Sequence, residues 1–368
     1  MSERGALGII ACLAGEPLAQ KINQTLLDKL GWAVQDTTFL RTINETHFPN
    51  TEVKVEIQES IRGQDIYVIQ DCENSCCGWE IKPPNEDERA YSRKKVITDV
   101  SKQPADHFIK FSVDENLRAL TTAIDAAKRA DANYVTAVLP AFPYARQDKA
   151  ISREGITAEK VAKEIMNSGA DRVITLDIHN RAIAGFFGSI PVENLYASRT
   201  LIDHIRTLSL DNLVVVAPDA GGMPRAQHYA QRLEVPLANI YKQRDYSSAS
   251  VVEQMRLNGD VKDKNVLIID DMIATGGTLI KALQTLKDNG AQDTYFASSL
   301  PLLTPPAIRR ISEAYQQGLL KKVITTDAVY HADLAQRKEW LEEVSIAPYI
   351  AKVIYHINAR RSISELLE

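Results

Sequence analysis

The sequence contains few cysteines. Four occur in 368 residues, and three of them lie close together at Cys72, Cys76 and Cys77. A fold that depends on disulfides is much richer in cysteine, so a disulfide framework is excluded. Neither a second cysteine pair nor a histidine pair lies nearby at the spacing of a zinc finger. We therefore expect these three residues to be reduced thiols in a surface loop.

Long apolar runs and a secretory signal are also lacking. No apolar stretch approaches the roughly 20 residues that a membrane-spanning helix needs. The apolar run near the start, from Leu7 to Cys12, is too short and too poorly flanked for a signal peptide. These absences predict a cytoplasmic protein that does not act on a membrane.

Positive charge is not in excess. The formal net charge is −5 at pH 7, with 43 Lys and Arg against 48 Asp and Glu. Proteins that bind the phosphate backbone of nucleic acids usually carry an excess of cations, so a nucleic-acid partner is not expected. An anionic ligand must instead be met by a local group of cations.

What the sequence does contain is a repeated alternation of strand and helix patterns. The length of 368 residues predicts two domains, and 45% hydrophobic with 25% charged residues is ordinary for a globular protein. Buried strands that alternate with amphipathic helices predict an α/β fold, with mostly parallel sheets flanked by helices. The clearest strand patterns are 65–70, 134–139, 172–177, 213–217 and 265–270, and the clearest helix patterns are 116–130 and 157–168, the second with Thr157 as its N-cap.

Carboxylates stand at or just after the ends of several predicted strands. They are Asp177, Asp219, Asp270 and Asp271. In open α/β sheets, ligands collect at the carboxyl ends of the strands. We therefore expect these side chains to line clefts.

One stretch interrupts the alternation. From Glu73 to about His107 the composition becomes polar, with a Pro-Pro pair and clusters of charge. This pattern predicts a long surface insertion. Its role stays open between a linker or mobile hairpin and a partner-binding segment.

A glycine-containing turn follows the strand Val266–Ile269. Asp270 and Asp271 come directly after that strand, and the turn Thr-Gly-Gly-Thr at 275–278 leads into a helix that begins near Leu279. Glycines let backbone N–H groups close around a phosphate, threonine hydroxyls add donors, and a helix N-terminus favours an anion. The paired aspartates could accept hydrogen bonds from ribose hydroxyls or lie near a divalent cation. The sequence therefore predicts a site for a phosphorylated ribose rather than an ordinary strand-to-helix turn.

A loop dense in cations follows the strand 134–139. Arg146, Lys149 and Arg153 could clamp a polyphosphate, and the Arg146 guanidinium offers bidentate geometry. Taken alone, such a loop is more often a solvated surface turn.

These two segments resemble motifs of one family. The string 266–279 resembles the ribose 5-phosphate loop of the phosphoribosyltransferase fold, and Phe-Pro-Tyr-Ala-Arg-Gln-Asp-Lys at 142–149 resembles the flexible-loop signature of the ribose-phosphate pyrophosphokinase family. Further strings resemble that family in the same order: 48–52, 60–63, 176–179, 217–222 and 241–244.

The resemblance implies two phosphoribosyltransferase-like α/β domains. The N-terminal domain would be 1–195, with an insertion at about 73–107, and it would be joined by the C-terminal segment 358–368. The C-terminal domain would be 196–357 and would carry the ribose 5-phosphate loop.

The resemblance also implies the site residues. Lys242, Arg244 and Arg146 would stabilise the group being transferred. ATP would be bound by Phe48, Asn50, Glu52, Arg146, Gln147, Asp148 and His179. Ribose 5-phosphate would be bound by Asp219, Asp270, Asp271, Thr275, Gly276, Gly277 and Thr278, and the metal ion by His179 and Asp219.

The implied reaction transfers the β,γ-diphosphoryl group of ATP to the 1-hydroxyl of ribose 5-phosphate and gives 5-phosphoribosyl 1-diphosphate and AMP. The implied cofactor is Mg²⁺. In the family the segment at 48–52 reaches the adenine of a neighbouring subunit's ATP, so the resemblance implies a homo-oligomer whose active site lies at a subunit interface.

Some positions depart from the family pattern. Ala274 stands where Asp is frequent, and Ala182, Ala184 and Leu367 replace residues of the family's allosteric phosphate and ADP site, so that regulation is not expected here. Two alternatives to the enzyme stay open: a non-catalytic regulatory homologue and a type I phosphoribosyltransferase. The retained charged residues argue against the first alternative, and the 146–149 loop and the chain length argue against the second.

Overall fold

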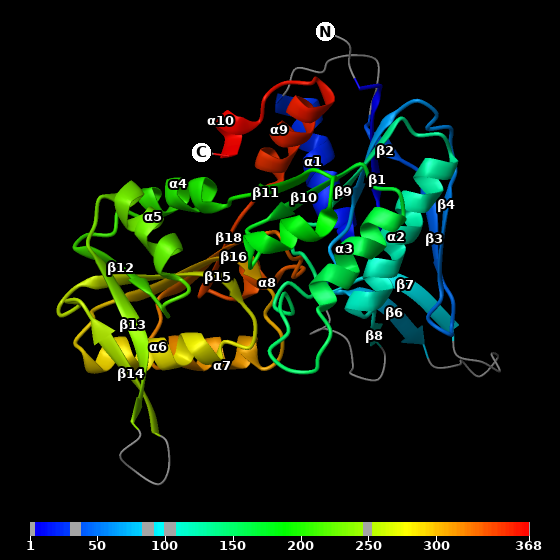
Figure 1. Cartoon of the computed structure of the whole chain (residues 1–368). Helices are drawn as coiled ribbons and strands as arrows, with labels where there is room; N and C mark the ends of the chain where they lie inside the picture. Colours follow the sequence, from blue (N-terminus) through cyan, green and yellow to red (C-terminus); the bar gives the residue numbers. More distant parts are fainter. Residues whose placement is uncertain (1–3, 30–37, 83–91, 99–107, 246–251, 368) are drawn as a thin grey trace. The chain divides into compact units, whose positions relative to one another are not determined.

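The computed structural model describes residues 4–29, 38–82, 92–98, 108–245 and 252–367 (Figure 1). The chain divides into two compact units. Unit 1 comprises 1–196, 328–333 and 346–368, and unit 2 comprises 197–327 and 334–345. The return to unit 1 is longer than the expected segment 358–368, because it also includes 328–333 and 346–357.

Unit 1 is built on a parallel sheet, as the alternating pattern predicts. Its strand order is β11-β10-β9-β5-β1-β2, and each neighbouring pair runs parallel. The sheet is central, and β5 and β9 consist almost entirely of buried residues. The bounds are β1 Leu7–Ala11, β2 Leu40–Arg41, β5 Asp65–Ile69, β9 Tyr134–Val138, β10 Arg172–Leu176 and β11 Val192–Leu195.

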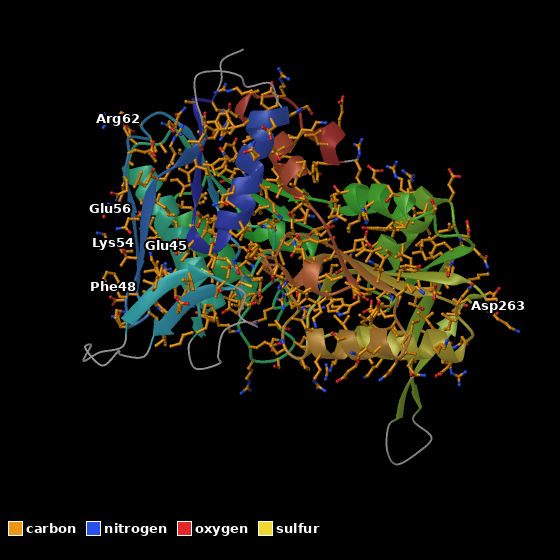
Figure 2. The ribbon with its side chains drawn as sticks, turned by 180° about the vertical axis from the view of Figure 1, so that it is seen from behind. Glu45, Phe48, Lys54, Glu56, Arg62 and Asp263 are labelled. Carbon is orange, nitrogen blue, oxygen red and sulfur yellow. The ribbon has the colours of Figure 1, made fainter. Side chains whose placement is uncertain are left out.

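Helices cover both faces of this sheet (Figures 1 and 2). Helices α2 and α3 lie together on one face, and α1 packs against α9 on the other. The bounds are α1 Glu16–Lys29, α2 Val113–Arg129, α3 Thr157–Asn167, α9 Ala347–Asn358 and α10 Ser364–Leu367, with short 3₁₀ helices η1 Leu13–Gly15 and η3 Arg181–Phe187.

The starts of α2 and α3 differ from expectation for local reasons. Helix α2 begins before the predicted residue 116 because Ser112 and Glu115 form a capping box, each side chain bonding the backbone N–H of the other. Helix α3 begins at Thr157, so Thr157 as N-cap is wrong; the N-cap is Ile156, without a side-chain cap. The Thr157 hydroxyl instead donates to Gln147 Oε1, at 2.6 Å.

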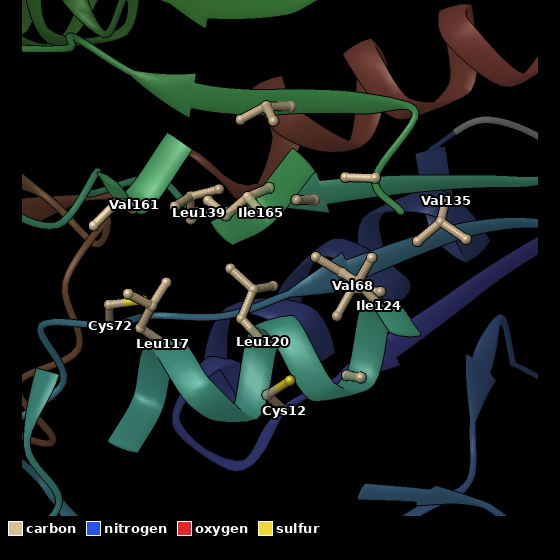
Figure 3. Close-up of a cluster of buried hydrophobic side chains, with 14 of the residues drawn as sticks. Cys12, Val68, Cys72, Leu117, Leu120, Ile124, Val135, Leu139, Val161 and Ile165 are labelled. Carbon is tan, nitrogen blue, oxygen red and sulfur yellow. The ribbon is translucent and has the colours of Figure 1, made fainter. Parts of the chain in front are cut away.

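The main core of unit 1 lies between the sheet and helices α2 and α3 (Figure 3). Leu117, Leu120 and Ile124 of α2 recur at helical spacing and face the strands that carry Val68 and Val135. This packing fixes α2 against the strands, and the loops that carry candidate site residues follow the carboxyl ends of those strands.

The cysteines are not in a surface loop, and that prediction is wrong. Cys12, Cys72, Cys76 and Cys77 are all buried free thiols. Cys12 and Cys72 belong to the apolar layer under α2 (Figure 3), and Cys77 packs with Phe111 in a smaller cluster. Burial raises the pKa of the Cys12 and Cys72 thiols well above the usual value, so both remain in the neutral form.

The polar stretch after Glu73 forms part of a small sheet. Strands β7, β6 and β8 pair in that order, with both pairings antiparallel. A separate hairpin, β3 paired with β4, precedes β5 in the sequence. The bounds are β3 Ile43–His47, β4 Val53–Ile57, β6 Cys77–Lys82, β7 Ser92–Ile97 and β8 Phe108–Lys110; residues 83–91 and 99–107 lie outside the described part of the chain.

Unit 2 is a second sheet with helices on both faces. Its strand order is β14-β13-β12-β15-β16-β17-β18, parallel except for the β13–β14 pair. Helices α4 and α5 lie on one face and α6 and α7 on the other (Figure 1). The strands are β12 Leu213–Ala217, β13 Leu237–Asp245, β14 Val252–Asn258, β15 Asn265–Ile273, β16 Thr294–Pro301, β17 Lys322–Thr326 and β18 Leu341–Val344; the helices are α4 Ser198–Thr207, α5 Met223–Leu233, α6 Gly277–Asp288, α7 Ala307–Gln316 and α8 Leu334–Arg337. Across the described residues, no helix combines the length and apolar character that crossing a membrane requires.

Candidate active site

The turn from β15 into α6 has the geometry of a phosphate cradle. Gly276 is the N-cap of α6 and has a φ of +74°, a left-handed conformation that favours glycine. The backbone N–H groups of the first helical turn have no intrahelical acceptor and point out of the helix end. Thr275 and Thr278 are exposed beside them, and the Thr275 carbonyl accepts a hydrogen bond from Arg310 at 3.1 Å. Backbone N–H groups, two hydroxyls and a nearby guanidinium therefore gather at one helix end.

Asp270 and Asp271 lie inside β15 rather than after it, because the strand continues to Ile273. Burial, followed by the negative charge of Asp271, raises the pKa of Asp270 to about 7. Arg225 approaches both carboxylates, at 3.8 Å from an oxygen of each. A ligand that donates hydrogen bonds or brings positive charge would therefore stabilise the two carboxylates.

Sequence reasoning missed Arg225. It is the third residue of α5, and a cation in the first turn of a helix opposes the helix dipole. This unfavourable placement was the signal in the sequence that Arg225 contacts carboxylates, because nearby negative charge would offset it.

Asp219 follows the end of β12, the strand next to β15. Its Oδ1 accepts a hydrogen bond from the Gly222 N–H at 2.9 Å, which fixes the loop at the start of α5. Val216 of β12 pairs with Ile268 of β15, so Asp219 and Asp271 stand at a similar level of the sheet. Unit 2 therefore brings Asp219, the aspartate pair and the phosphate cradle to one edge.

Lys242 and Arg244 lie on β13, on the other side of β12. Their backbones pair with Met255 and Glu253 of β14. The placement of the Lys242 and Arg244 side chains lies outside what the structure describes.

In unit 1, the loop with Arg146, Gln147 and Asp148 follows β9 and is held at several points. The Tyr144 hydroxyl donates to Asp114 of α2 at 2.8 Å, and Tyr144 has a left-handed φ of 59°. Gln147 is bonded to the start of α3 through both its side chain and its backbone carbonyl. Arg146 is exposed on this loop, and its charge lowers the pKa of Glu73 against the larger, raising effect of burial.

His179 follows the end of β10. Asp177 adopts a φ of 41°, and the Ile178 N–H donates to Asn194 Oδ1 at 2.9 Å, so the chain turns sharply and leaves His179 exposed. The next residue, Asn180, donates a side-chain hydrogen bond to Asp148. This bond brings the His179 segment next to the Arg146 to Asp148 loop.

The predicted nucleotide residues Phe48, Asn50 and Glu52 form the tip of the β3–β4 hairpin. The Phe48 N–H donates to the Glu52 carbonyl at 2.8 Å, and the Asn50 side chain accepts from the Glu52 N–H at 3.3 Å. Phe48 is 40% exposed at the end of the hairpin, where Figure 2 labels it. A groove of about 820 Å³ lies beside it, lined also by Arg118, Lys160 and Asp114.

A metal ion held by protein groups alone does not fit these residues. Among the residues described, no three His, Cys, Asp or Glu side chains are close enough to form such a site. Mg²⁺ bound to substrate phosphates commonly needs only one or two carboxylates and keeps several waters. Asp219, whose Oδ1 accepts the Gly222 N–H, and Asp270 in β15 are carboxylates that fit this second kind of site.

Comparisons with known proteins agree with this geometry. Residues 7–169 match the family model described as the N-terminal domain of ribose phosphate pyrophosphokinase, 192–304 match a phosphoribosyl transferase domain, and 249–368 match a phosphoribosyl synthetase-associated domain.

Curated relatives cover most of the chain. A ribose-phosphate pyrophosphokinase of Chlorobaculum tepidum is 38% identical over 88% of this chain and 86% of its own length. Ribose-phosphate pyrophosphokinase 2 of Enterococcus faecalis is 34% identical over 98% of this chain and 96% of its own. The crystal structure of phosphoribosylpyrophosphate synthetase from Mycobacterium smegmatis superposes with a TM-score of 0.76 at 31% identity, covering 96% of this chain and 99% of that one.

Proposed function

The chain belongs to the ribose-phosphate pyrophosphokinase family, and on that premise we propose that it transfers the β,γ-diphosphoryl group of ATP to the 1-hydroxyl of ribose 5-phosphate. The products are 5-phosphoribosyl 1-diphosphate and AMP. The observation that carries the proposal is the edge of unit 2, where Asp219, the aspartate pair and the Gly276 cradle stand together.

Ribose 5-phosphate is assigned to this edge of unit 2. Its phosphate binds the N–H groups and hydroxyls of Thr275, Gly276, Gly277 and Thr278. Asp270 and Asp271 accept hydrogen bonds from the ribose 2- and 3-hydroxyls, and Arg225 holds their orientation from α5. The ligand thus offsets the repulsion between two carboxylates that the empty protein must tolerate.

ATP is assigned to groups of unit 1. Arg146, Gln147, Asp148 and His179 come from two loops that the Asn180–Asp148 hydrogen bond holds together. Phe48, Asn50 and Glu52 present an exposed aromatic ring and polar groups, which suit a purine. As the family resemblance implies, this hairpin serves the ATP of a neighbouring subunit in a homo-oligomer.

Positioning and charge neutralisation are the protein's part in the reaction. Diphosphoryl transfer needs the attacking oxygen and the leaving oxygen nearly in line, with cations on the oxygens of the moving group. Lys242, Arg244 and Arg146 supply those cations. Asp219 and His179 are the residues that would hold Mg²⁺, which would supply further charge neutralisation.

The test follows AMP in a mixture of protein, ATP, Mg²⁺ and ribose 5-phosphate. AMP that appears only with ribose 5-phosphate supports the proposal. Nucleotide formed from phosphoribosyl diphosphate and a base would instead indicate a phosphoribosyltransferase. No turnover in either mixture would indicate a non-catalytic homologue.

Four free, buried cysteines also suit a cytoplasmic enzyme.

A further inference from the structure

We propose that the small sheet formed by the insertion positions the nucleotide hairpin, and that His47 and Glu45 are the positioning residues through which it acts. This inference rests on the proposed function, because it takes the hairpin tip as the part that contacts ATP. It gives the insertion a role in binding one substrate and not the other.

His47 lies at the base of the hairpin tip formed by residues 48–52. It is the last residue of β3, pairs with Val53 of β4, and immediately precedes Phe48. Its side chain is buried, and its Nε2 lies 2.6 Å from Oε1 of Glu45. The other oxygen of Glu45 accepts the Leu13 N–H at 2.8 Å, which ties the hairpin to the segment just after strand β1.

Aromatic rings from the small sheet enclose His47. Phe111, just after β8, stacks on the His47 ring with centroids 3.8 Å apart and planes 5° apart. Trp79 of β6 meets His47 edge-on at 6.4 Å and Phe111 edge-on at 5.8 Å. The Phe111 N–H donates to the Cys77 carbonyl at 2.8 Å. This bond holds the backbone that carries the stacking ring against β6, the first strand of the insertion.

These contacts hold the His47 ring in one orientation. Within the described structure its Nδ1 is buried without a hydrogen-bond partner, so Glu45 and the two aromatic rings determine its orientation. Loss of the His47 side chain would leave the buried Glu45 Oε1 without its hydrogen-bond partner. Loss of the Trp79 side chain would open a gap beside the His47 ring. Either change would free the strand end that holds Phe48.

The tip needs such support because Phe48 is a large apolar side chain that is 40% exposed. An exposed aromatic contact gains affinity when its position is fixed before the ligand binds. The tip itself supplies a short turn, with Thr51 at a strained φ of 71°. The rigid base must therefore come from the buried groups around His47.

The experiment measures kcat and the KM for each substrate in Trp79→Ala, His47→Leu and His47→Gln. The expected result is a KM for ATP raised about tenfold in the first two variants, with the KM for ribose 5-phosphate and kcat within about twofold of wild type. His47→Gln should restore the KM for ATP to within about twofold, because its amide N–H can replace the Nε2 donor. Lys94→Ala, at an exposed position of β7 in the same sheet, is the control and should change neither KM.

Three results would overturn the inference. The first is an unchanged KM for ATP in both Trp79→Ala and His47→Leu. The second is an equal rise in both KM values, which would indicate general loss of structure, and the third is no rescue by His47→Gln. If Trp79→Ala does not fold, the comparison of His47→Leu with His47→Gln decides. A wild-type protein without AMP-forming activity would instead refute the proposed function, so the two failures are distinguishable.

Discussion

The proposed phosphate cradle of unit 2 and the proposed nucleotide hairpin of unit 1 are held in shape by different means. The cradle is made by adjacent residues, with a left-handed Gly276 at the start of α6. The hairpin tip depends on groups distant in the sequence, from Leu13 to Phe111, that meet around His47. Local geometry therefore fixes the first site, and long-range packing fixes the second. Single substitutions in each region should separate the two.

Lys242→Ala should have the largest effect, because it removes a cation that we propose stabilises the moving group. Turnover should fall about 100-fold, with the KM for ribose 5-phosphate nearly unchanged. Steady-state AMP formation measures both quantities. An unchanged turnover would remove Lys242 from the catalytic role.

Gly276→Val tests the local site. A β-branched residue strains a φ of +74° and brings its side chain against Ala307 and Ile311 of α7, so the turn that carries the cradle N–H groups must shift. The KM for ribose 5-phosphate should therefore rise about 30-fold while that for ATP changes little. Gly318→Val is the matched control, since Gly318 also has a positive φ, of +66°, with open space around it. Both variants should lose similar stability. If both raise the KM equally, strain rather than the cradle is responsible.

Phe48→Ala tests the packed site. The KM for ATP should rise about fivefold from the lost ring contact, and the KM for ribose 5-phosphate should stay the same. Ile109→Ala, at another large apolar side chain of unit 1 that is 50% exposed, should alter neither value. A rise in the ribose 5-phosphate KM after Phe48→Ala would contradict the division between the two regions.

Asp270→Asn should have the smallest effect and concerns stability without ligand. The pKa of Asp270 is raised from 3.8 to about 7, so the folded state holds its proton where the unfolded state has lost it. This group therefore stabilises the fold least above pH 7, and its contribution declines as pH rises from about 4 to 7. Asp270→Asn should raise the unfolding free energy by about 1 kcal/mol at pH 8 and leave it nearly unchanged at pH 5.

Chemical denaturation at the two pH values measures the difference. The expected gain is kept small because Arg225 and partial exposure of Asp270 already offset part of its burial. A variant less stable than wild type at pH 8 would show that the carboxylate pair is not under repulsion.

The same contrast explains what the sequence could predict. The parallel sheets and the cradle at 275–278 were predictable, because periodicity and glycine turns are local signals. The burial of Cys72, Cys76 and Cys77 was not, since the polar residues after Glu73 suggested a surface loop and hid a three-stranded sheet. The Asn180–Asp148 bond and the approach of Arg225 to Asp270 join separate elements, and no spacing in the sequence encodes them.

The proposed reaction requires that two phosphoryl groups leave ATP together. Phosphorus NMR of ATP, Mg²⁺ and ribose 5-phosphate with the full chain follows the nucleotide and the sugar product at once. We expect AMP and a diphosphate ester on the sugar, formed in equal amounts. ADP with a sugar monophosphate ester would contradict it, since that result would mean transfer of one phosphoryl group.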